Sequence, residues 1–338
     1  MTRILSSSTA ISVRNAGSSA LASLAASMAP GSWANFACGN LSNATLYAYT
    51  PGGTLGILNN FGNRLVWDAA HRKIQYAASA HTGGPVVTGA GGLATWDDAS
   101  NQWSRETYNW SSENPGHSYH HVAVNPNNGD LYFRSFNSRS IYRRVYGQTG
   151  QASWQVFSTI GGNYANQVAG ALEWLPGLNG GAGGLVFADT LGAAWSNAAL
   201  TSWTGQSGSA PSGPYHNWSA AAGGLVYFGG GNGSTAMYAI NSSGAVNSKA
   251  ATPMQAGASA ASAVFAHPNG TDLLLFQNYA STGSIYRFNG TSWSSAGTHQ
   301  IGDSSGIWAG CAIPEYGVML FLVFPNAGGT PFCKIYKP

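Results

Sequence analysis

The sequence has few charged side chains and little excess of either sign. Charged residues make up 7% of its 338 positions, against about 25% in an average globular protein. Fourteen Lys and Arg residues against eleven Asp and Glu residues leave a net charge of only +3. A nucleic-acid-binding surface needs a denser cluster of positive charge than this. We therefore expect no nucleic-acid partner.

Cysteines and long apolar segments are also scarce. Cys38, Cys311 and Cys333 lack the spacing of a metal-binding motif, and we interpret them as free buried thiols, with one disulfide plus a leftover cysteine as the alternative. No segment approaches the roughly 18 apolar residues of a membrane span. The N-terminus has no apolar run of the roughly 7–15 residues that a signal peptide needs, so we expect no cleaved signal.

Glycine and aromatic residues, in contrast, are abundant. The chain contains 46 Gly, and aromatic residues make up 12% of it, with many Ser, Ala and Asn residues between them. The surface of such a protein is polar but nearly neutral. This composition is typical of proteins that bind sugars or pack into a larger assembly.

The chain is built from repeated units. Each unit has a short apolar strand, a turn, a strongly apolar strand and a third strand, and most units end near a Trp. Trp103, Trp154 and Trp203 follow one another at intervals of 51 and 49 residues, and two units separate Trp203 from Trp293. A period of about 40 to 50 residues is that of a four-stranded propeller blade.

The sixth unit reaches the C-terminus without a fourth strand. The segment PGSWANFAC, which contains Trp33, can supply that strand by pairing with residues 332–337, and this would remove two free sheet edges. We predict an all-β, six-bladed β-propeller over residues 30–338 closed by an N-terminal strand. The alternative has seven blades, with residues 39–60 as the extra one. Residues 1–29 are predicted to form an arm outside the ring, with an Ala-rich helix at about 17–28.

Several motifs resemble those of kelch-type and galactose-oxidase-like propellers. They are the strand–turn–strand units, the endings DDASNQW and FNGTSW, and the glycine doublet at Gly229 and Gly230. Only the fourth unit has the doublet, and no copper-ligand set is present, so oxidase activity does not carry over. The Gly-rich and Asn-rich blades behind an N-terminal arm are also similar to propellers carried by bacteriophages in tails or fibres.

The candidate functional residues lie in connections that a propeller brings to one face. These are the connections that enter each first strand and those between the second and third strands. Units two to four supply most of the imidazole, amide and aromatic groups, and Trp110 is a plausible sugar-stacking platform. The candidate ligand-binding residues are His81, Trp110, His117, Tyr119, His120, Arg134, Arg139, Gln167, Tyr215 and His216.

The same set could form the active site of a polysaccharide lyase that acts by β-elimination on a uronate-containing glycan. A cation would neutralise the carboxylate, a neutral His would take the C5 proton, and a Tyr would protonate the leaving oxygen. Some propeller-fold polysaccharide lyases are similar in using His, Tyr and Arg. The candidate catalytic residues are His120, His216, Tyr119, Tyr215 and Arg134, with Arg139 and Gln167 as further carboxylate ligands.

Other interpretations stay open beside this one. A hydrolase with paired carboxylates fits less well, because the only acids near this sector are Glu113, Glu173 and Asp189, and Glu173 is expected on a blade strand. The histidines could instead hydrogen-bond neighbouring blades and hold the ring together. A metal site at His117, His120 and His121 is the least favoured interpretation, since adjacent strand residues point to opposite faces.

We predict a non-enzymatic propeller that binds a glycan or host-surface ligand, without cofactor or metal. Its expected location is a virion or another extracellular surface, with residues 1–29 anchoring it to the other proteins of the assembly. The first alternative is the polysaccharide lyase. The second is a propeller that only packs against other proteins.

Overall fold

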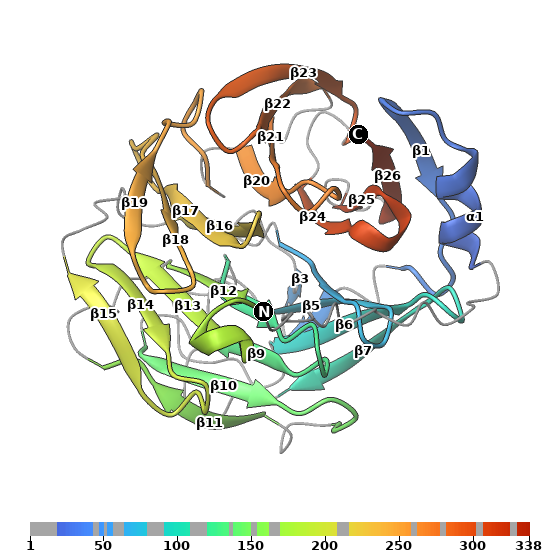
Figure 1. The fold of residues 1–338 in the computed structure, drawn as a ribbon. Helices are drawn as coiled ribbons and strands as arrows, with labels where there is room; N and C mark the ends of the chain where they lie inside the picture. The colour runs from blue at the N-terminus through green and yellow to red at the C-terminus, as the bar shows by residue number, and fades with distance from the viewer. Residues whose placement is uncertain are drawn as a thin grey trace, which may run out of the picture.

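The computed structural model describes residues 19–42, 47–50, 53–56, 64–79, 91–108, 120–134, 138–149, 154–161, 170–207, 216–257, 262–277, 282–301, 307–324 and 330–338. Six four-stranded antiparallel sheets form a ring around a common axis (Figure 1). The first strands of the sheets contact one another in a closed circle. The protein is therefore an all-β, six-bladed propeller, as predicted.

The blades follow the chain in order. Blade 1 contains β4 (Val66–Asp68), β5 (Lys73–Ser79), β6 (Gly91–Asp97) and β7 (Gln102–Tyr108). Blade 2 contains β8 (Val122–Val124), β9 (Leu131–Arg134), β10 (Ser140–Arg144) and β11 (Trp154–Thr159). Blade 3 contains β12 (Ala171–Leu175), β13 (Gly184–Asp189), β14 (Gly192–Ser196) and β15 (Trp203–Ser207), with the short helix η2 (Asn179–Gly181) after β12.

The second half of the ring repeats this plan. Blade 4 contains β16 (Asn217–Ala222), β17 (Leu225–Gly230), β18 (Met237–Ile240) and β19 (Val246–Lys249). Blade 5 contains β20 (Ser262–Ala266), β21 (Leu273–Gln277), β22 (Gly283–Phe288) and β23 (Trp293–His299). Blade 6 contains β24 (Ile307–Ile313), β25 (Val318–Phe324) and β26 (Phe332–Lys337), with η4 (Pro314–Tyr316) between its first two strands.

Apolar runs form the second strand of each blade because both faces of that strand are covered. β9 and β13, for example, are buried along their whole length, since a neighbouring blade packs on either side. Trp103 and Trp154, at the starts of the outer strands, are 1% and 7% exposed. The Trp spacing thus marks side chains that pack between blades.

The ring is closed by β1 (Ser32–Phe36), which is the fourth strand of blade 6. β1 pairs antiparallel with β26 from Ser32 opposite Lys337 to Phe36 opposite Cys333. The Trp33 ring stacks on Tyr336 with 4.6 Å between centroids. The predicted closure is confirmed. Residues 47–50 and 53–56 form a two-stranded sheet of β2 (Tyr47–Thr50) and β3 (Gly53–Gly56) instead of a blade, so the seven-blade alternative is wrong.

The helix α1 (Ala20–Ser27) precedes β1 and lies at the rim of the ring (Figure 1). Ser19 Oγ caps it by accepting a hydrogen bond from the N–H of Ala22 at 3.1 Å. Leu21 and Ala25 are buried in the apolar cluster shared by blades 1 and 6. The predicted helix is present, but it packs on the propeller instead of lying outside the ring. The helix is therefore part of the packed body, and residues 1–18 lie outside the described residues.

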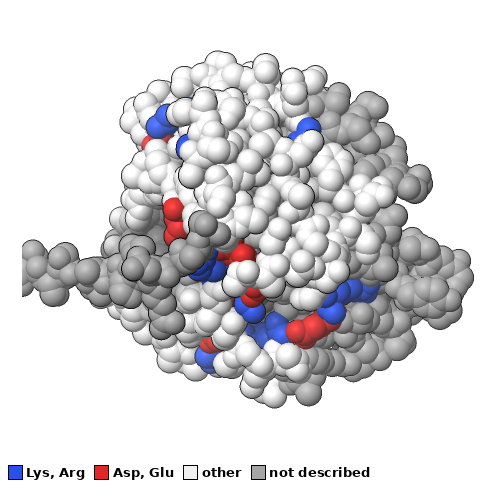
Figure 2. All heavy atoms as spheres, turned by 90° about the vertical axis from the view of Figure 1, so that its right-hand side faces the viewer, with Lys and Arg blue, Asp and Glu red and all other residues white. Residues whose placement is uncertain are grey.

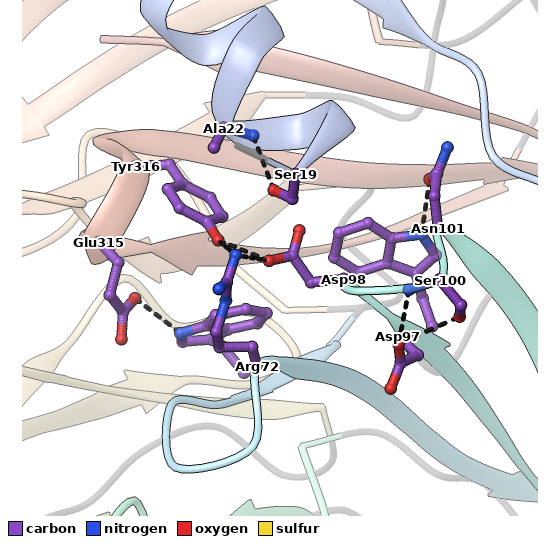
Figure 3. Close-up of polar contacts among 11 residues, drawn as sticks. Ser19, Ala22, Arg72, Asp97, Asp98, Ser100, Asn101, Glu315 and Tyr316 are labelled. Atoms are coloured by element: carbon purple, nitrogen blue, oxygen red, sulfur yellow. Dashed lines mark hydrogen bonds and ion pairs between the residues drawn. The ribbon is translucent and has the colours of Figure 1, made fainter. Parts of the chain in front are cut away.

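A polar junction joins α1 to blades 1 and 6. In Figure 3, the side chains of Arg72, Asp98 and Tyr316 meet next to Ser19. Arg72 donates to the Asp98 carboxylate and to the Tyr316 hydroxyl, and Tyr316 donates to Asp98 Oδ2 at 2.5 Å. Asp98 is 1% exposed, so these donors compensate a carboxylate that has lost its hydration. The junction stabilises the seam where the ring closes.

The three cysteines are free thiols, as in the first of the two interpretations, but Cys38 is only half-buried. Cys311 and Cys333 are buried, and burial raises the pKa of both thiols, so neither is a reactive thiolate at neutral pH. Within the described ranges, no helix has the length and apolar character that a membrane crossing requires.

Candidate functional sites

Six of the ten predicted ligand-binding residues fall outside the described residues. They are His81, Trp110, His117, Tyr119, Gln167 and Tyr215. Their proposed contacts with a ligand, and the roles of Tyr119 and Tyr215 as general acids, stay predictions. The structure places the other four, His120, Arg134, Arg139 and His216.

His120 is a buried link between blades. It is 1% exposed, its carbonyl oxygen accepts a hydrogen bond from the N–H of Leu172 at 2.7 Å, and its Nδ1 accepts one from the N–H of Ser219 at 3.3 Å. These contacts connect blade 2 to blades 3 and 4. The pKa of His120 is well below its usual value because burial disfavours the imidazolium and the nearby Arg64 cation adds to this effect.

Arg134 is also buried, at 0% exposed. Its guanidinium lies 4.7 Å from the centre of the Phe187 ring in blade 3, and its Nη1 is 3.2 Å from His121 Nε2. Burial lowers its pKa to about 10, with the Asp189 carboxylate acting in the opposite direction. Its position is that of a side chain that holds blades 2 and 3 together.

His216 and Arg139 lie at the ends of connections. His216 has a left-handed backbone, with φ of 60°, and its Nδ1 is 2.8 Å from Oδ1 of Asn232 in the turn after β17. Arg139 is half-buried, and its carbonyl oxygen accepts a hydrogen bond from Ile160. His120 and Arg134 thus make contacts between blades, and His216 makes one within blade 4. Such contacts are those of the structural interpretation, and the roles of these residues in a lyase stay a prediction.

A cavity of about 350 Å³ lies at the propeller axis and is lined by the first strands of all six blades. We call it the axial cavity. Arg64, which precedes β4, reaches across the axis at one end of it. Its Nη1 donates to the carbonyl oxygen of Leu172 at 2.8 Å and to Ser219 Oγ at 3.0 Å, and its Nη2 donates to Glu173 Oε2 at 2.5 Å. One side chain thus connects blades 1, 3 and 4.

The remaining walls of the axial cavity are mostly apolar. Trp67 and Phe265 are its aromatic residues, and its far end lies at the turns that follow the first strands. There, Trp67 Nε1 donates to Oε2 of the exposed Glu315 at 2.7 Å. Other residues around the cavity are Leu65, Val66, Ala69, Val124, Pro126, Pro176, Ala220, Ala221, Ala266, Cys311, Ala312 and Pro314.

A second cavity, of about 170 Å³, lies between blades 1 and 2. We call it the interblade cavity. Three polar side chains on its blade 1 wall form a row across neighbouring strands, because Gln75 pairs with Thr95 and Thr95 pairs with Ser104. Gln75 is only 4% exposed, and its Oε1 has no hydrogen-bond partner among the described residues. An unpaired buried amide oxygen costs about 1–3 kcal/mol, so a donor that met Gln75 Oε1 after a turn of this side chain would relieve that cost.

Tyr146 is an aromatic platform at the edge of the interblade cavity and is 37% exposed. Its ring lies flat on His71, with 3.3 Å between centroids and 5° between planes. His71 Nδ1 is in turn 2.9 Å from Asp68 Oδ2, and the N–H of Tyr146 donates to Asp130 Oδ1 at 3.0 Å. These contacts fix the ring and leave its other face uncovered by His71.

A charged pair crosses the interblade cavity. Arg144 Nη2 of blade 2 donates to Glu106 Oε1 of blade 1 at 2.7 Å, and the two side chains are 11% and 33% exposed. Lys73 Nζ lies 3.4 Å from Asp97 Oδ2 and 5.6 Å from the centre of the Tyr146 ring. The cavity therefore combines fixed donors, fixed acceptors and one aromatic face.

Close packing beside the platform requires a glycine. Gly129, before β9, has φ of 74°, and a Cβ atom there would lie 2.4 Å from His71 Nδ1 and 2.5 Å from Asp68 Oδ2. A larger residue would both strain the backbone and displace the imidazole beneath Tyr146. The turn before β9 in blade 2 therefore packs closely against the turn after β4 in blade 1.

The surface around these sites is otherwise nearly free of charge. In Figure 2, most of the visible surface is uncharged, and many of the Lys and Arg side chains lie beside Asp or Glu side chains. Lys73 with Asp97 and Arg144 with Glu106 are ion pairs in which both side chains are partly exposed. Among the described residues, no group of three or more His, Cys, Asp or Glu side chains could hold a metal ion.

Of the four candidate ligand-binding residues that the structure describes, only His120 lines a cavity, the axial one, and the other residues that build the two cavities were not candidates for ligand binding. Glu173 was expected on a blade strand, and it lies on β12. Its side chain pairs with Arg64 at the axis, a contact that the sequence analysis did not predict. A signal was available, because a charged residue inside an apolar strand is unusual in a chain with 7% charged residues. Glu173 within ALEWL and Arg64 before LVW both fit this description.

Comparisons with known proteins confirm the fold. No protein-family model matches the sequence, and no curated relative is found. The chain is similar in structure to AofleA from Arthrobotrys oligospora, with a TM-score of 0.54, 10% identity, and coverage of 91% of this chain and 86% of that one. It is also similar to a catalytically inactive virginiamycin B lyase from Staphylococcus aureus with quinupristin, with a TM-score of 0.50, 10% identity, and coverage of 90% and 99%. At this identity the likeness shows a β-propeller fold.

Proposed function

We propose that the protein is a glycan-binding propeller without catalytic activity and that the interblade cavity holds one sugar unit. The observation that supports this most directly is that the fixed Tyr146 ring and a row of amide and hydroxyl side chains line the same cavity. A pyranose has one apolar face and a rim of hydroxyl groups, and aromatic rings with adjacent hydrogen-bonding groups complement both.

The charged pair supports the same ligand class. A hydroxyl group both donates and accepts hydrogen bonds, so a neutral sugar can use the Arg144 guanidinium and the Glu106 carboxylate together without introducing a net charge. The unpartnered Gln75 Oε1 would accept from a third hydroxyl. This pocket therefore favours a sugar with several hydroxyl groups over an apolar ligand.

The direct test is retention of the purified protein on an array of immobilised neutral and acidic glycans, followed by calorimetric titration with the best binder. Tyr146→Ala should weaken that binding about fivefold or more, because loss of an aromatic stacking contact costs on the order of 1 kcal/mol or more. No retention on any glycan, or full affinity in Tyr146→Ala, would contradict the proposal.

Val156→Ala is the matched control. Val156 is an exposed apolar side chain of blade 2, 54% exposed, and lies on β11 away from the interblade cavity. Its truncation removes exposed apolar surface from the same blade but leaves the platform intact. Glycan affinity in this variant should equal that of the unchanged protein.

We further propose that the propeller displays this cavity on a virion or another extracellular surface. The support is compositional, namely the low charge and the abundance of Gly, Asn and aromatic residues. Since α1 packs on the ring, anchoring to other assembly proteins would depend on residues 1–18. A chain lacking residues 1–18 should bind glycan normally but no longer co-sediment with virions, and unchanged co-sedimentation would exclude the anchoring role.

A further inference from the structure

The axial cavity differs from the interblade cavity in the chemistry of its walls. Its volume of about 350 Å³ lies within the range of about 300–1,000 Å³ that is usual for small-molecule pockets. Apolar side chains from all six blades form most of its walls, and the Arg64–Glu173 pair forms one end. Such a pocket matches a molecule with an apolar body and a polar group at one end.

The Arg64 guanidinium keeps hydrogen-bonding capacity for such a group. Arginine has five N–H donors, and three hydrogen bonds to Leu172, Ser219 and Glu173 are present. Glu173 accepts from Arg64 at Oε2 and from the N–H of Trp174 at Oε1. Each carboxylate oxygen can accept more than one hydrogen bond, so both members of the pair can still bind a ligand.

The charges at this end cancel. Arg64 and Glu173 are 10% and 9% exposed, so little water screens a third charge placed beside them. His120 lies next to this pair and is neutral at neutral pH. An anionic group would gain from Arg64 but be repelled by Glu173, and the reverse holds for a cation. The exposed Glu315 at the far end is hydrated and screened.

We propose that the axial cavity is a binding site for a small molecule with an apolar body and one uncharged hydrogen-bonding group, such as a carboxamide, which contacts Arg64 and Glu173. This site is separate from the interblade cavity and does not depend on the glycan-binding proposal.

The test compares benzamide with benzoate, which have nearly the same size and differ in the charge of the polar group. Ligand-observed NMR titration should show that the full chain binds benzamide at least tenfold more tightly than benzoate. In Glu173→Gln the end of the cavity carries a net positive charge from Arg64, so the preference should reverse toward benzoate. Absence of benzamide binding, or equal binding of both probes by the unchanged protein, would overturn the proposal.

A second variant covers the case in which Glu173→Gln does not fold. Ala266 lines the axial cavity at the end of β20 and is only half-buried, so Ala266→Leu fills part of the volume and leaves the charged pair intact. Benzamide binding should be lost in Ala266→Leu and retained in Tyr146→Ala, which alters only the interblade cavity. Undiminished benzamide binding by a folded Ala266→Leu protein would show that the probe binds elsewhere and would reject the assignment.

Discussion

The two cavities each contain one Arg–Glu pair, and the pairs differ in their surroundings. Arg64 and Glu173 meet at the axis, where both side chains are about one-tenth exposed, whereas Glu106 in the interblade cavity is one-third exposed. Arg64 also bonds to two further blade 3 and blade 4 groups. The same two side-chain types are therefore shielded from water at the axis and partly hydrated between blades 1 and 2.

The largest expected difference between the two pairs is in how much the free energy of unfolding falls when the arginine is replaced. Arg64→Met should lower the free energy of unfolding by about 3–5 kcal/mol, because it leaves the Glu173 carboxylate nearly buried without a counter-ion. Arg144→Met should lower it by about 1 kcal/mol or less, because Glu106 regains water. Urea denaturation of both variants measures the difference. Equal losses would mean that burial does not distinguish the two pairs.

Acidic pH should weaken the fold through its buried histidines. His120, His267 and His299 have lowered pKa values, in each case chiefly because they are buried. The unfolded chain therefore takes up protons near pH 6.5 that the folded chain does not. Stability should be constant above this pH and fall as the pH drops through it, by up to about 1.4 kcal/mol per unit for each histidine.

Unfolding titrations from pH 8 to pH 5 test this expectation. His120→Gln should reduce the steepness of the loss, because one of the three histidines that resist protonation is gone. An unchanged pH profile in this variant would show that His120 is protonated equally in the folded and unfolded chains.

Glycan affinity should respond to a conservative substitution of Arg144 in the interblade cavity. Arg144→Lys keeps the positive charge but replaces the planar set of donors with a single ammonium group. We expect glycan binding to weaken about tenfold while the free energy of unfolding changes by less than about 0.5 kcal/mol. Calorimetric titration and urea denaturation measure the two quantities. Unchanged affinity would show that Arg144 does not bind the glycan and only joins blades 1 and 2.

The smallest expected difference between the two pairs is in how strongly salt weakens the interaction between their charges. Double-mutant cycles for the two pairs, at low and high ionic strength, should show a coupling energy that salt reduces for Arg144–Glu106 and leaves almost unchanged for Arg64–Glu173. The reason is that mobile ions reach the exposed Glu106 but not the enclosed axial pair. A similar salt effect on both couplings would indicate that the axial cavity is freely accessible to ions.

The architecture could be predicted because it depends on local patterns. The Trp spacing gives the blade period, and Trp33 in PGSWANFAC identifies the strand that closes the ring. These patterns are visible in the sequence because the order of apolar and polar residues within a strand depends on which of its faces are buried. It does not depend on the identity of residues far away in the chain. The predicted pairing with residues 332–337 is the register that the structure shows.

The sites could not be predicted in the same way, because they depend on contacts between blades. Arg64 meets Glu173 and Ser219, which lie more than 100 positions further along the chain, and Tyr146 rests on His71 of another blade. Sequence reasoning instead favoured the dense histidine cluster around His120. Within that cluster, His120 makes hydrogen bonds to blades 3 and 4. His117 and Tyr119, the other predicted residues of the cluster, lie outside the described residues.

The closing strand also sets the order of events during synthesis. β1 leaves the ribosome early, but its partner β26 is made roughly 300 residues later, which takes about 15–60 s at about 5–20 residues per second. Throughout that interval blade 6 is incomplete and β1 has no neighbour, so two sheet edges are open to pairing with other chains. Any product that terminates before β26 keeps both edges unpaired, so synthesis of residues 332–337 decides between a closed ring and an aggregation-prone fragment.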